Sequence, residues 1–269
     1  MTWALEDRVA VVTGGAQGLG RAIGERLVEE GCALIVADLD GAGAKAVAST
    51  LEEAARPVLG LGVDVTREDE VATMFEFVLH ELGRVDIVVA NAGILIAEPI
   101  EIADAANWRA VIEVNLVGYF LTAKHACRAM KPQGSGSIVC ISSKSGKRGS
   151  AANSSYSASK FGEIGLTESI ALEMAPFNVR CNAVCPGNLL DSPLWTDPEK
   201  GLLVQYLRAG KVPGAETVED VRQAYVEAVP MKRGCTYDDV CDAVCFLASD
   251  RASYITGVAL SVTGGQEMT

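Results

Sequence analysis

The segment between residues 8 and 38 is the part of the sequence that most restricts the fold. An apolar run at residues 8–13, RVAVVT, leads directly into the glycine-rich turn GGAQGLG. A helical segment over residues 21–30 follows, and a second apolar run at residues 33–37 ends at Asp38. Strand, glycine turn, helix, strand and acid in this order predict a parallel βαβ unit with a dinucleotide site.

The glycines and the acid of this unit indicate which cofactor it takes. Backbone amides at a helix amino terminus bind pyrophosphate, and Gly14, Gly18 and Gly20 allow a close approach to them. Asp38 lies 18 residues after Gly20, where an acid accepts ribose hydroxyls. A carboxylate there repels a ribose phosphate, so the sequence favours NAD over NADP.

Apolar runs and helical patterns continue to alternate along the chain, which predicts an α/β fold with a doubly wound parallel sheet, the Rossmann fold. We expect a single domain over residues 1–269. The irregular stretch at about 188–234 is too long for a simple connection and is interpreted as a substrate lid with helical pieces. Predicted strands cover 8–13, 33–37, 57–63, 85–90, 138–141, 178–184 and 258–262; predicted helices cover 21–30, 67–82, 104–130 (closed by Pro132), 154–175 and 237–249.

The stretch from Ser137 to Lys160 carries the candidate chemistry. Ser143 follows a buried apolar run, at the edge where open parallel sheets place their active sites. Tyr156 and Lys160 are four residues apart, so on a helix they share one face. A nearby ammonium lowers the pKa of a phenol, which lets tyrosine exchange a proton with a substrate hydroxyl. Without the preceding strand and turn and the dinucleotide pattern, Tyr156 and Lys160 would be interpreted as part of a solvent-exposed helix face.

Composition excludes several classes of function. A net charge of -12 disfavours nucleic acid and anionic membranes as partners, and no apolar run reaches transmembrane length. The amino terminus has no signal-peptide pattern, which predicts a cytoplasmic protein. The eight cysteines lack zinc-ligand spacing and there are only two histidines, so no metal site is expected.

The sequence resembles the short-chain dehydrogenase/reductase family over nearly its whole length. The resemblance rests on TGxxxGxG at Thr13–Gly20, NAG at Asn91–Gly93, Asn115, Ser143, YxxxK at Tyr156–Lys160 and Pro186-Gly187. It implies seven strands in the order 3-2-1-4-5-6-7, and homotetramers are common in the family.

The resemblance also implies a role for each matching residue. Tyr156 would be the general base or acid and Ser143 would orient the substrate hydroxyl. Lys160 would bind the nicotinamide ribose and lower the pKa of Tyr156, and Asn115 would support a water proton relay. Asn115 could instead be a helix-bulge residue, and Asp64 a turn former. The implied cofactor residues are Gly14, Gln17, Gly18, Leu19, Gly20, Asp38, Asp64, Val65, Asn91, Gly93, Tyr156, Lys160, Pro186 and Gly187.

Further segments are similar to bacterial enzymes of this family that oxidise sugar-alcohol phosphates with NAD. They include SKSGKRGS, GNLLDSPLW and TGGQEM, and they favour a polyol or sugar derivative as the small-molecule substrate. The chain departs from that group at Ala151 and Asp191, where lysine is usual. A different ketone and a non-catalytic NAD sensor remain as alternatives. The predicted substrate residues are Ser143, Lys144, Lys147, Tyr156 and Asn188.

The cations that follow Ser143 admit two interpretations. Lys144, Lys147 and Arg148 could form an anion pocket for a phosphate or sulfonate at the far end of the substrate. They could equally form a solvated basic turn, with Arg148 in a subunit contact.

Overall fold

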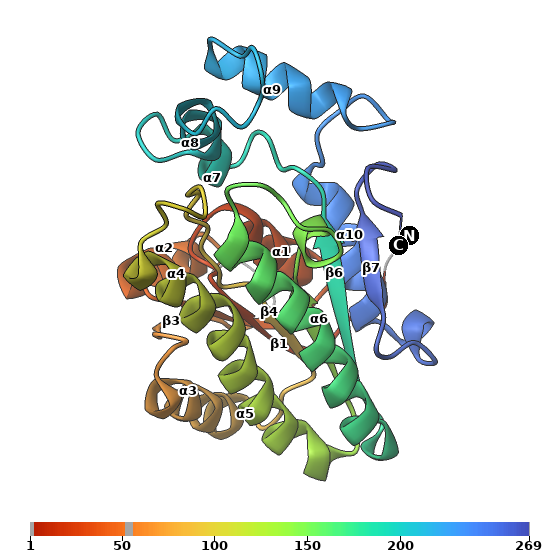
Figure 1. Ribbon diagram of the computed structural model, residues 1–269. Helices are drawn as coiled ribbons and strands as arrows, with labels where there is room; N and C mark the ends of the chain where they lie inside the picture. Colours follow the sequence, from red (N-terminus) through yellow and green to blue (C-terminus); the bar gives the residue numbers. More distant parts are fainter. Residues whose placement is uncertain (1–2, 52–55, 269) are drawn as a thin grey trace.

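The computed structural model of the protein describes residues 3–51 and 56–268. Within these ranges seven parallel strands form one sheet in the order β3-β2-β1-β4-β5-β6-β7, which confirms the predicted topology (Figure 1). The strands are β1 (Val9–Thr13), β2 (Ala33–Asp38), β3 (Val58–Gly62), β4 (Ile87–Ala90), β5 (Gly136–Ile141), β6 (Val179–Pro186) and β7 (Ala259–Val262). The helices are α1 (Gly18–Glu29), α2 (Gly41–Thr50), α3 (Glu68–Leu82), α4 (Ala105–Ile112), α5 (Gly118–Gln133), α6 (Ser154–Met174), α7 (Pro193–Thr196), α8 (Leu202–Arg208), α9 (Val218–Glu227) and α10 (Tyr237–Ala248).

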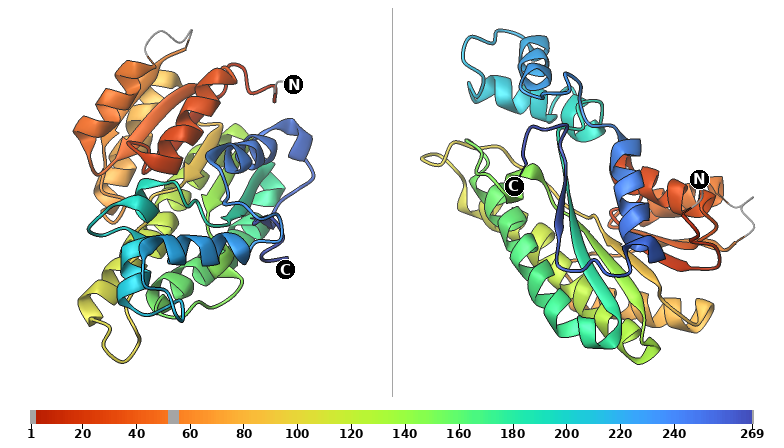
Figure 2. Two further views of the ribbon diagram at one scale, coloured as in Figure 1. Left: turned by 90° about the horizontal axis from the view of Figure 1, so that it is seen from above. Right: turned by 90° about the vertical axis from the view of Figure 1, so that its right-hand side faces the viewer.

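The sheet is buried on both faces, which explains why its strands are almost wholly apolar. Residues of α1, α2 and α10, among them Leu27 and Val244, pack on one face. Residues of α3, α5 and α6, among them Phe75 and Ala171, pack on the other. The right-hand view of Figure 2 shows these two helical layers with the sheet between them.

Helix α2 was not predicted. Its sequence, GAGAKAVAST, consists mostly of small residues, so it carries little of the hydrophobic periodicity that marks a helix. Asp40 caps it, because the Asp40 side chain accepts a hydrogen bond of 2.9 Å from the amide of Gly43. Ala44 and Val47 bury its inner face.

The long helix predicted over 104–130 is interrupted and ends later than expected. A π-helical turn, Glu113–Val117, joins α4 to α5, and Pro132 lies inside α5 instead of closing it. Proline in the last turn removes only one backbone hydrogen bond, so the helix continues to Gln133. Gly134, with φ of 66°, then ends it.

Segment 188–234 forms a separate layer beyond the carboxyl ends of the strands (Figure 2). It contains α7, α8 and α9 and has its own small core, which includes Trp195, Tyr206 and Val221. Leu95, from the loop after β4, belongs to the same core. The segment therefore lies over the edge of the sheet where the candidate site residues are found.

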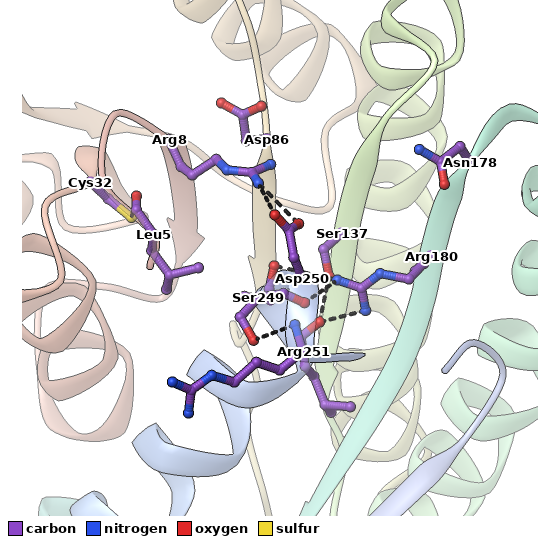
Figure 3. Close-up of polar contacts among 12 residues, drawn as sticks. Leu5, Arg8, Cys32, Asp86, Ser137, Asn178, Arg180, Ser249, Asp250 and Arg251 are labelled. Carbon is purple, nitrogen blue, oxygen red and sulfur yellow. Dashed lines mark hydrogen bonds and ion pairs between the residues drawn. The ribbon is translucent and has the colours of Figure 1, made fainter. Parts of the chain in front are cut away.

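The opposite edge of the sheet is held together by polar contacts (Figure 3). Arg180, on β6, donates to the carbonyl oxygens of Leu247, Ala248 and Ser249 at 2.6, 3.3 and 3.1 Å. These groups belong to the carboxyl end of α10 and the residue after it, where carbonyls lack helical partners. Arg180 thereby fixes α10 against the sheet.

No helix in the described part of the chain is both long and apolar enough to cross a lipid bilayer.

Candidate active site

The carboxyl ends of β1, β4, β5 and β6 lie side by side because these strands are parallel neighbours. The turns that follow them bring together the glycine-rich turn, Asn91, Ser143 and Gly187, which are far apart in the sequence. Open α/β sheets bind their ligands at this edge.

The glycine-rich turn leaves room for a ligand and no room for side chains. A Cβ on Gly20 would lie 2.0 Å from the carbonyl oxygen of Gly14, and one on Gly14, with φ of +63°, would lie 2.8 Å from Cα of Ala92. Gln17 precedes α1 without a side-chain cap, so the first amides of the helix are available to an anion. These features fit the pyrophosphate of a dinucleotide.

Asn91 holds this turn in place. Its Nδ2 donates to the carbonyl oxygens of Thr13 and Gly14, each at 3.0 Å. Asn91, which the sequence predicts to lie beside the cofactor, therefore also has a structural role in supporting this turn.

Three further predicted cofactor residues lie at the ends of β2 and β3. Asp38 accepts hydrogen bonds of 3.0 Å from the amides of Ala16 and Asp40, which places its carboxylate against the glycine-rich turn. Asp64 accepts from both the amide and the hydroxyl of Thr66, at 2.9 and 2.7 Å, as a turn-forming residue does. Val65 is buried.

Ser143, Tyr156 and Lys160 meet at the end of β5. Ser143 follows the strand, and its Oγ accepts a hydrogen bond of 3.1 Å from the amide of Ser145. Tyr156 lies in the first turn of α6, and the Nζ of Lys160 is 5.5 Å from the centroid of its ring. The Ser143 side chain is a hydrogen-bond partner that lowers the pKa of Tyr156. Serine, phenol and ammonium are therefore close enough to act on one substrate oxygen.

Glu163 is a member of this group that the sequence analysis missed. Its Oε1 accepts a hydrogen bond of 2.8 Å from Nζ of Lys160, which also donates to the carbonyl oxygen of Ile141 at 2.9 Å. The Lys160 and Glu163 side chains are 5% and 2% exposed. An acid three residues after a lysine on one helix was the available signal, because such pairs share a face.

The pKa of Tyr156 differs from the expectation. Burial raises it above its ordinary value, while Lys160 and Ser143 lower it only in part and the nearby Glu163 adds to the rise. The predicted lowering by Lys160 is therefore present, but burial outweighs it and leaves the pKa of Tyr156 raised. Burial lowers the pKa of Lys160, but Glu163 and Tyr156 outweigh this and leave it raised, so the ammonium stays charged.

Asn115 lies in the π-helical turn, and its side chain is fully engaged. Nδ2 donates to the carbonyl oxygen of Ile94 and to Oγ of Ser159, each at 3.0 Å, and Oδ1 accepts from the amide of Ile94 at 2.8 Å. It is both the bulge residue that was considered as an alternative and a support for the loop after β4. π-Helical turns often occur at functional sites.

The predicted substrate residues separate into two groups. Lys144 and Asn188 donate to the same oxygen, Oε1 of Gln266, at 2.9 and 3.2 Å. Lys147 instead donates to the carbonyl oxygen of Ala259 and to Oγ of Ser261, both on β7, at 2.6 and 2.9 Å. Arg148 is exposed. Of the three cations only Lys144 reaches segment 188–234, with its Nζ 5.6 Å from the Tyr225 ring centroid.

Lys211 is a second residue that the sequence analysis missed. It lies between α8 and α9, and its Nζ donates to Oγ of Ser150 at 3.0 Å and lies 3.8 Å from the ring centroid of Tyr206. Nothing in the local sequence indicates that it returns to the turn before α6. The described residues contain no group of three or more His, Cys, Asp or Glu side chains that could hold a metal ion.

Comparison with known proteins agrees with this geometry. A family model described as short chain dehydrogenase matches residues 8–201, and one described as enoyl-(acyl carrier protein) reductase matches residues 203–267. The chain is 41% identical over 266 residues to sorbitol-6-phosphate 2-dehydrogenase of Escherichia coli (strain K12), covering 97% of this chain and 99% of that protein. It is also 41% identical over 263 residues to cis-4-hydroxycyclohexanecarboxylate dehydrogenase of Sinomonas cyclohexanicum, covering 97% of each.

Solved structures show the same likeness. The crystal structure of sorbitol-6-phosphate 2-dehydrogenase from Erwinia amylovora matches with a TM-score of 0.91 and 41% identity, over 97% of this chain and 100% of that one. A structure of NAD+-bound xylitol dehydrogenase matches with a TM-score of 0.90 and 30% identity, over 97% and 99%.

Fold, site and relatives together define an oxidoreductase with a nicotinamide cofactor. Its family follows from the match over residues 8–201. The chain belongs to the short-chain dehydrogenase/reductase family, which confirms the predicted family resemblance. The predicted similarity to bacterial enzymes for sugar-alcohol phosphates is confirmed by the match to sorbitol-6-phosphate 2-dehydrogenase.

Proposed function

We propose that this enzyme uses NAD to interconvert a secondary alcohol and a ketone in a polyol or sugar derivative. The observation that carries the proposal is the meeting of Ser143, Tyr156 and Lys160 at the same end of the sheet as the glycine-rich turn. Bound NAD supplies the acceptor for the hydride that leaves the carbinol carbon. Ser143 orients the substrate hydroxyl, the phenolate oxygen of Tyr156 accepts its proton, and the ammonium of Lys160 favours the phenolate. In the reverse direction Tyr156 returns the proton to the ketone oxygen.

The substrate class follows from the relatives and the polar surroundings of Ser143. Sorbitol 6-phosphate and xylitol, in the names of two similar enzymes, are both polyol compounds. Lys144, Asn188 and Gln266 supply polar groups next to Ser143, which suits a hydroxylated substrate. Segment 188–234 serves as the lid over it, and the enzyme is expected in the cytoplasm.

The alternatives are distinguished by activity. A ketone with a large apolar group would need an apolar surface beside Ser143. The residue after Ser143 is instead Lys144, which donates to the side-chain amide of Gln266. A non-catalytic NAD sensor has no need of Ser143, Tyr156 and Lys160, all of which the chain brings together.

The direct test is NADH absorbance with a panel of sugar alcohols, their phosphates and cyclic alcohols. We expect turnover of at least one of them, and Tyr156→Phe should lower kcat by about 100- to 10,000-fold, the usual contribution of a positioned acid-base group. NAD binding, measured by calorimetry, should remain close to that of the wild type. Turnover by the variant within a few-fold of wild type would exclude Tyr156 as the proton-transfer group.

The cofactor preference is a separate prediction. Asp38 places a carboxylate at the end of β2 against the glycine-rich turn, where the phosphate of NADP would meet it. We expect kcat/KM with NAD to exceed that with NADP at least about tenfold, since like charges repel in a shared site. Equal values for the two cofactors would reject the assignment.

A further inference from the structure

Among the described residues, two lysine side chains beside the active site have no carboxylate partner. Lys144 follows Ser143 directly, and Lys211 reaches back from segment 188–234 to Ser150. Both are half-buried, and within the described residues neither has an acidic oxygen within 4.0 Å. Their hydrogen-bond partners are neutral: Oε1 of Gln266 for Lys144 and Oγ of Ser150 for Lys211. Partly buried ammonium groups without a counter-charge are costly in a folded protein.

The two ammonium groups face one aromatic pair. Lys211 lies over the ring of Tyr206 and Lys144 over that of Tyr225, and these rings stack with centroids 5.6 Å apart. The two lysines are close enough for Lys144 to lower the pKa of Lys211. Tyr156 packs against the same cluster, so the pair of cations lies next to the catalytic phenol.

The other charges nearby do not neutralise the two lysines. Asp191, at a position where lysine is usual in the similar enzymes, is paired with Arg222, which also donates to the carbonyl oxygen of Leu190 at 3.0 Å. Glu267 acts on Lys144 only from a distance, and Arg148 adds a further positive charge. Lys211 places an ammonium group beside Ser150, the sequence neighbour of Ala151.

We propose that Lys144 and Lys211 form an oxyanion subsite, so that the substrate is a secondary alcohol that carries a phosphate, sulfonate or carboxylate away from the reacting carbon. The proposal rests on the proposed dehydrogenase function and assigns the far end of its substrate. Lys147, tied to β7, takes no part. Names of two 41%-identical relatives, which contain a phosphate and a carboxylate, agree with a shared preference for an anionic group.

The subsite should depend on pH. Burial lowers the pKa of Lys144 to about 8 and that of Lys211 to about 7. Both lose charge as the pH rises, so the KM of an anionic substrate should rise between about pH 7 and 9. The other titratable groups that face them are Arg148, Glu267, Tyr156, Tyr206 and Tyr225; a neutral substrate of the same shape corrects for their titration.

The test compares matched substrates and matched variants. Sorbitol 6-phosphate is paired with sorbitol, and cis-4-hydroxycyclohexanecarboxylate with its methyl ester; the two pairs distinguish a phosphate from a carboxylate. Lys211→Gln removes one charge, Lys211→Arg keeps it, and Lys200→Gln, an exposed lysine of the same segment, is the control. Binding of each anion is also measured by calorimetry with NAD in the Tyr156→Phe background, where no turnover is needed.

We expect Lys211→Gln to lower kcat/KM for one of the two anions about 10- to 100-fold, the loss of one charge-assisted hydrogen bond, mainly through KM. The neutral partner should change by less than about threefold, and Lys211→Arg should restore most of the loss. Equal losses on both members of a pair, or a wild-type preference for both neutral compounds, overturn the subsite and leave the dehydrogenase intact. Absence of any turnover rejects the proposed function; calorimetry then still decides whether Lys211 binds an anion.

Discussion

At the residue scale, the buried pair of Lys160 and Glu163 determines how the catalytic phenol titrates. Glu163 accepts a hydrogen bond from the Lys160 ammonium and offsets part of its charge. Among the described residues, Cys140 on β5 and Cys185 on β6 are titratable groups that also interact with this pair, and burial raises the pKa of both. The acidity of the phenol therefore depends on this ion pair together with the hydrogen bond from Ser143.

Glu163→Gln tests this dependence. Without the carboxylate, the charge of Lys160 is less compensated and favours the phenolate more strongly, so the pKa of Tyr156 falls. Because oxidation needs the phenolate, the rise of kcat/KM for oxidation with pH should move to lower pH, by about one unit. The measurement is the pH profile, with Glu76→Gln, an exposed acid on α3, as the control. An unchanged profile would show that Glu163 has only a structural role.

At the element scale, α10 is attached to the sheet at the edge opposite the active site. Arg180 donates to three carbonyl oxygens at the end of α10, and Ser137 on β5 donates to that of Leu247 at 3.1 Å (Figure 3). These contacts replace the helical hydrogen bonds that a helix end lacks. They stabilise the fold and make no contact with the site.

Arg180→Met should therefore reduce stability and leave chemistry unchanged. Methionine keeps much of the apolar stem but removes all three hydrogen bonds from Arg180. Leu247 keeps its bond from Ser137 and Ser249 keeps one from the amide of Ala252, so we expect the free energy of unfolding to fall by about 2 kcal/mol. Urea unfolding measures this loss, and kcat at 25 °C should stay within about twofold of wild type. The control is Arg128→Met, an exposed position on α5. A large loss of kcat in the folded variant would contradict this separation.

At the scale of the whole molecule, α5 and α6 present an apolar outer surface. Phe120 on α5 is 45% exposed, and Phe161 and Leu172 on α6 are 48% and 80% exposed. The two helices lie side by side on one face of the molecule (Figure 1). Large apolar side chains gathered on one face are typical of a protein contact surface. We therefore predict that this face pairs with a second copy in a homotetramer.

Light scattering after gel filtration tests the assembly. Wild type should have the mass of four chains, and the double variant Phe120→Glu/Phe161→Glu should shift to two chains or one, because charges there would be buried in the contact. Leu79→Glu, at a partly exposed leucine on α3, should leave the mass unchanged. A wild-type monomer would contradict the prediction.

Local sequence was sufficient to predict those features that depend on interactions between residues close together in the chain. The strand, glycine turn and helix at residues 8–30 were predictable because backbone sterics and apolar periodicity act within a few residues. The same holds for the shared face of Tyr156 and Lys160, since helical spacing alone produces it. Parallel strands then place Ser143 at the same end of the sheet as the glycine-rich turn. The relative position of these two parts of the site could therefore be predicted from the fold class.

Tertiary structure decided what depends on burial and on distant parts of the chain. Sequence indicated a lower pKa for Tyr156, but burial and Glu163 raise it, because the energy of a charge depends on the whole environment. Lys144 and Lys147 are only three residues apart in the sequence, yet Lys147 reaches β7 and Lys144 reaches Tyr225. Lys211 reaches Ser150 across 61 residues, because only the packing of segment 188–234 over the sheet brings them together.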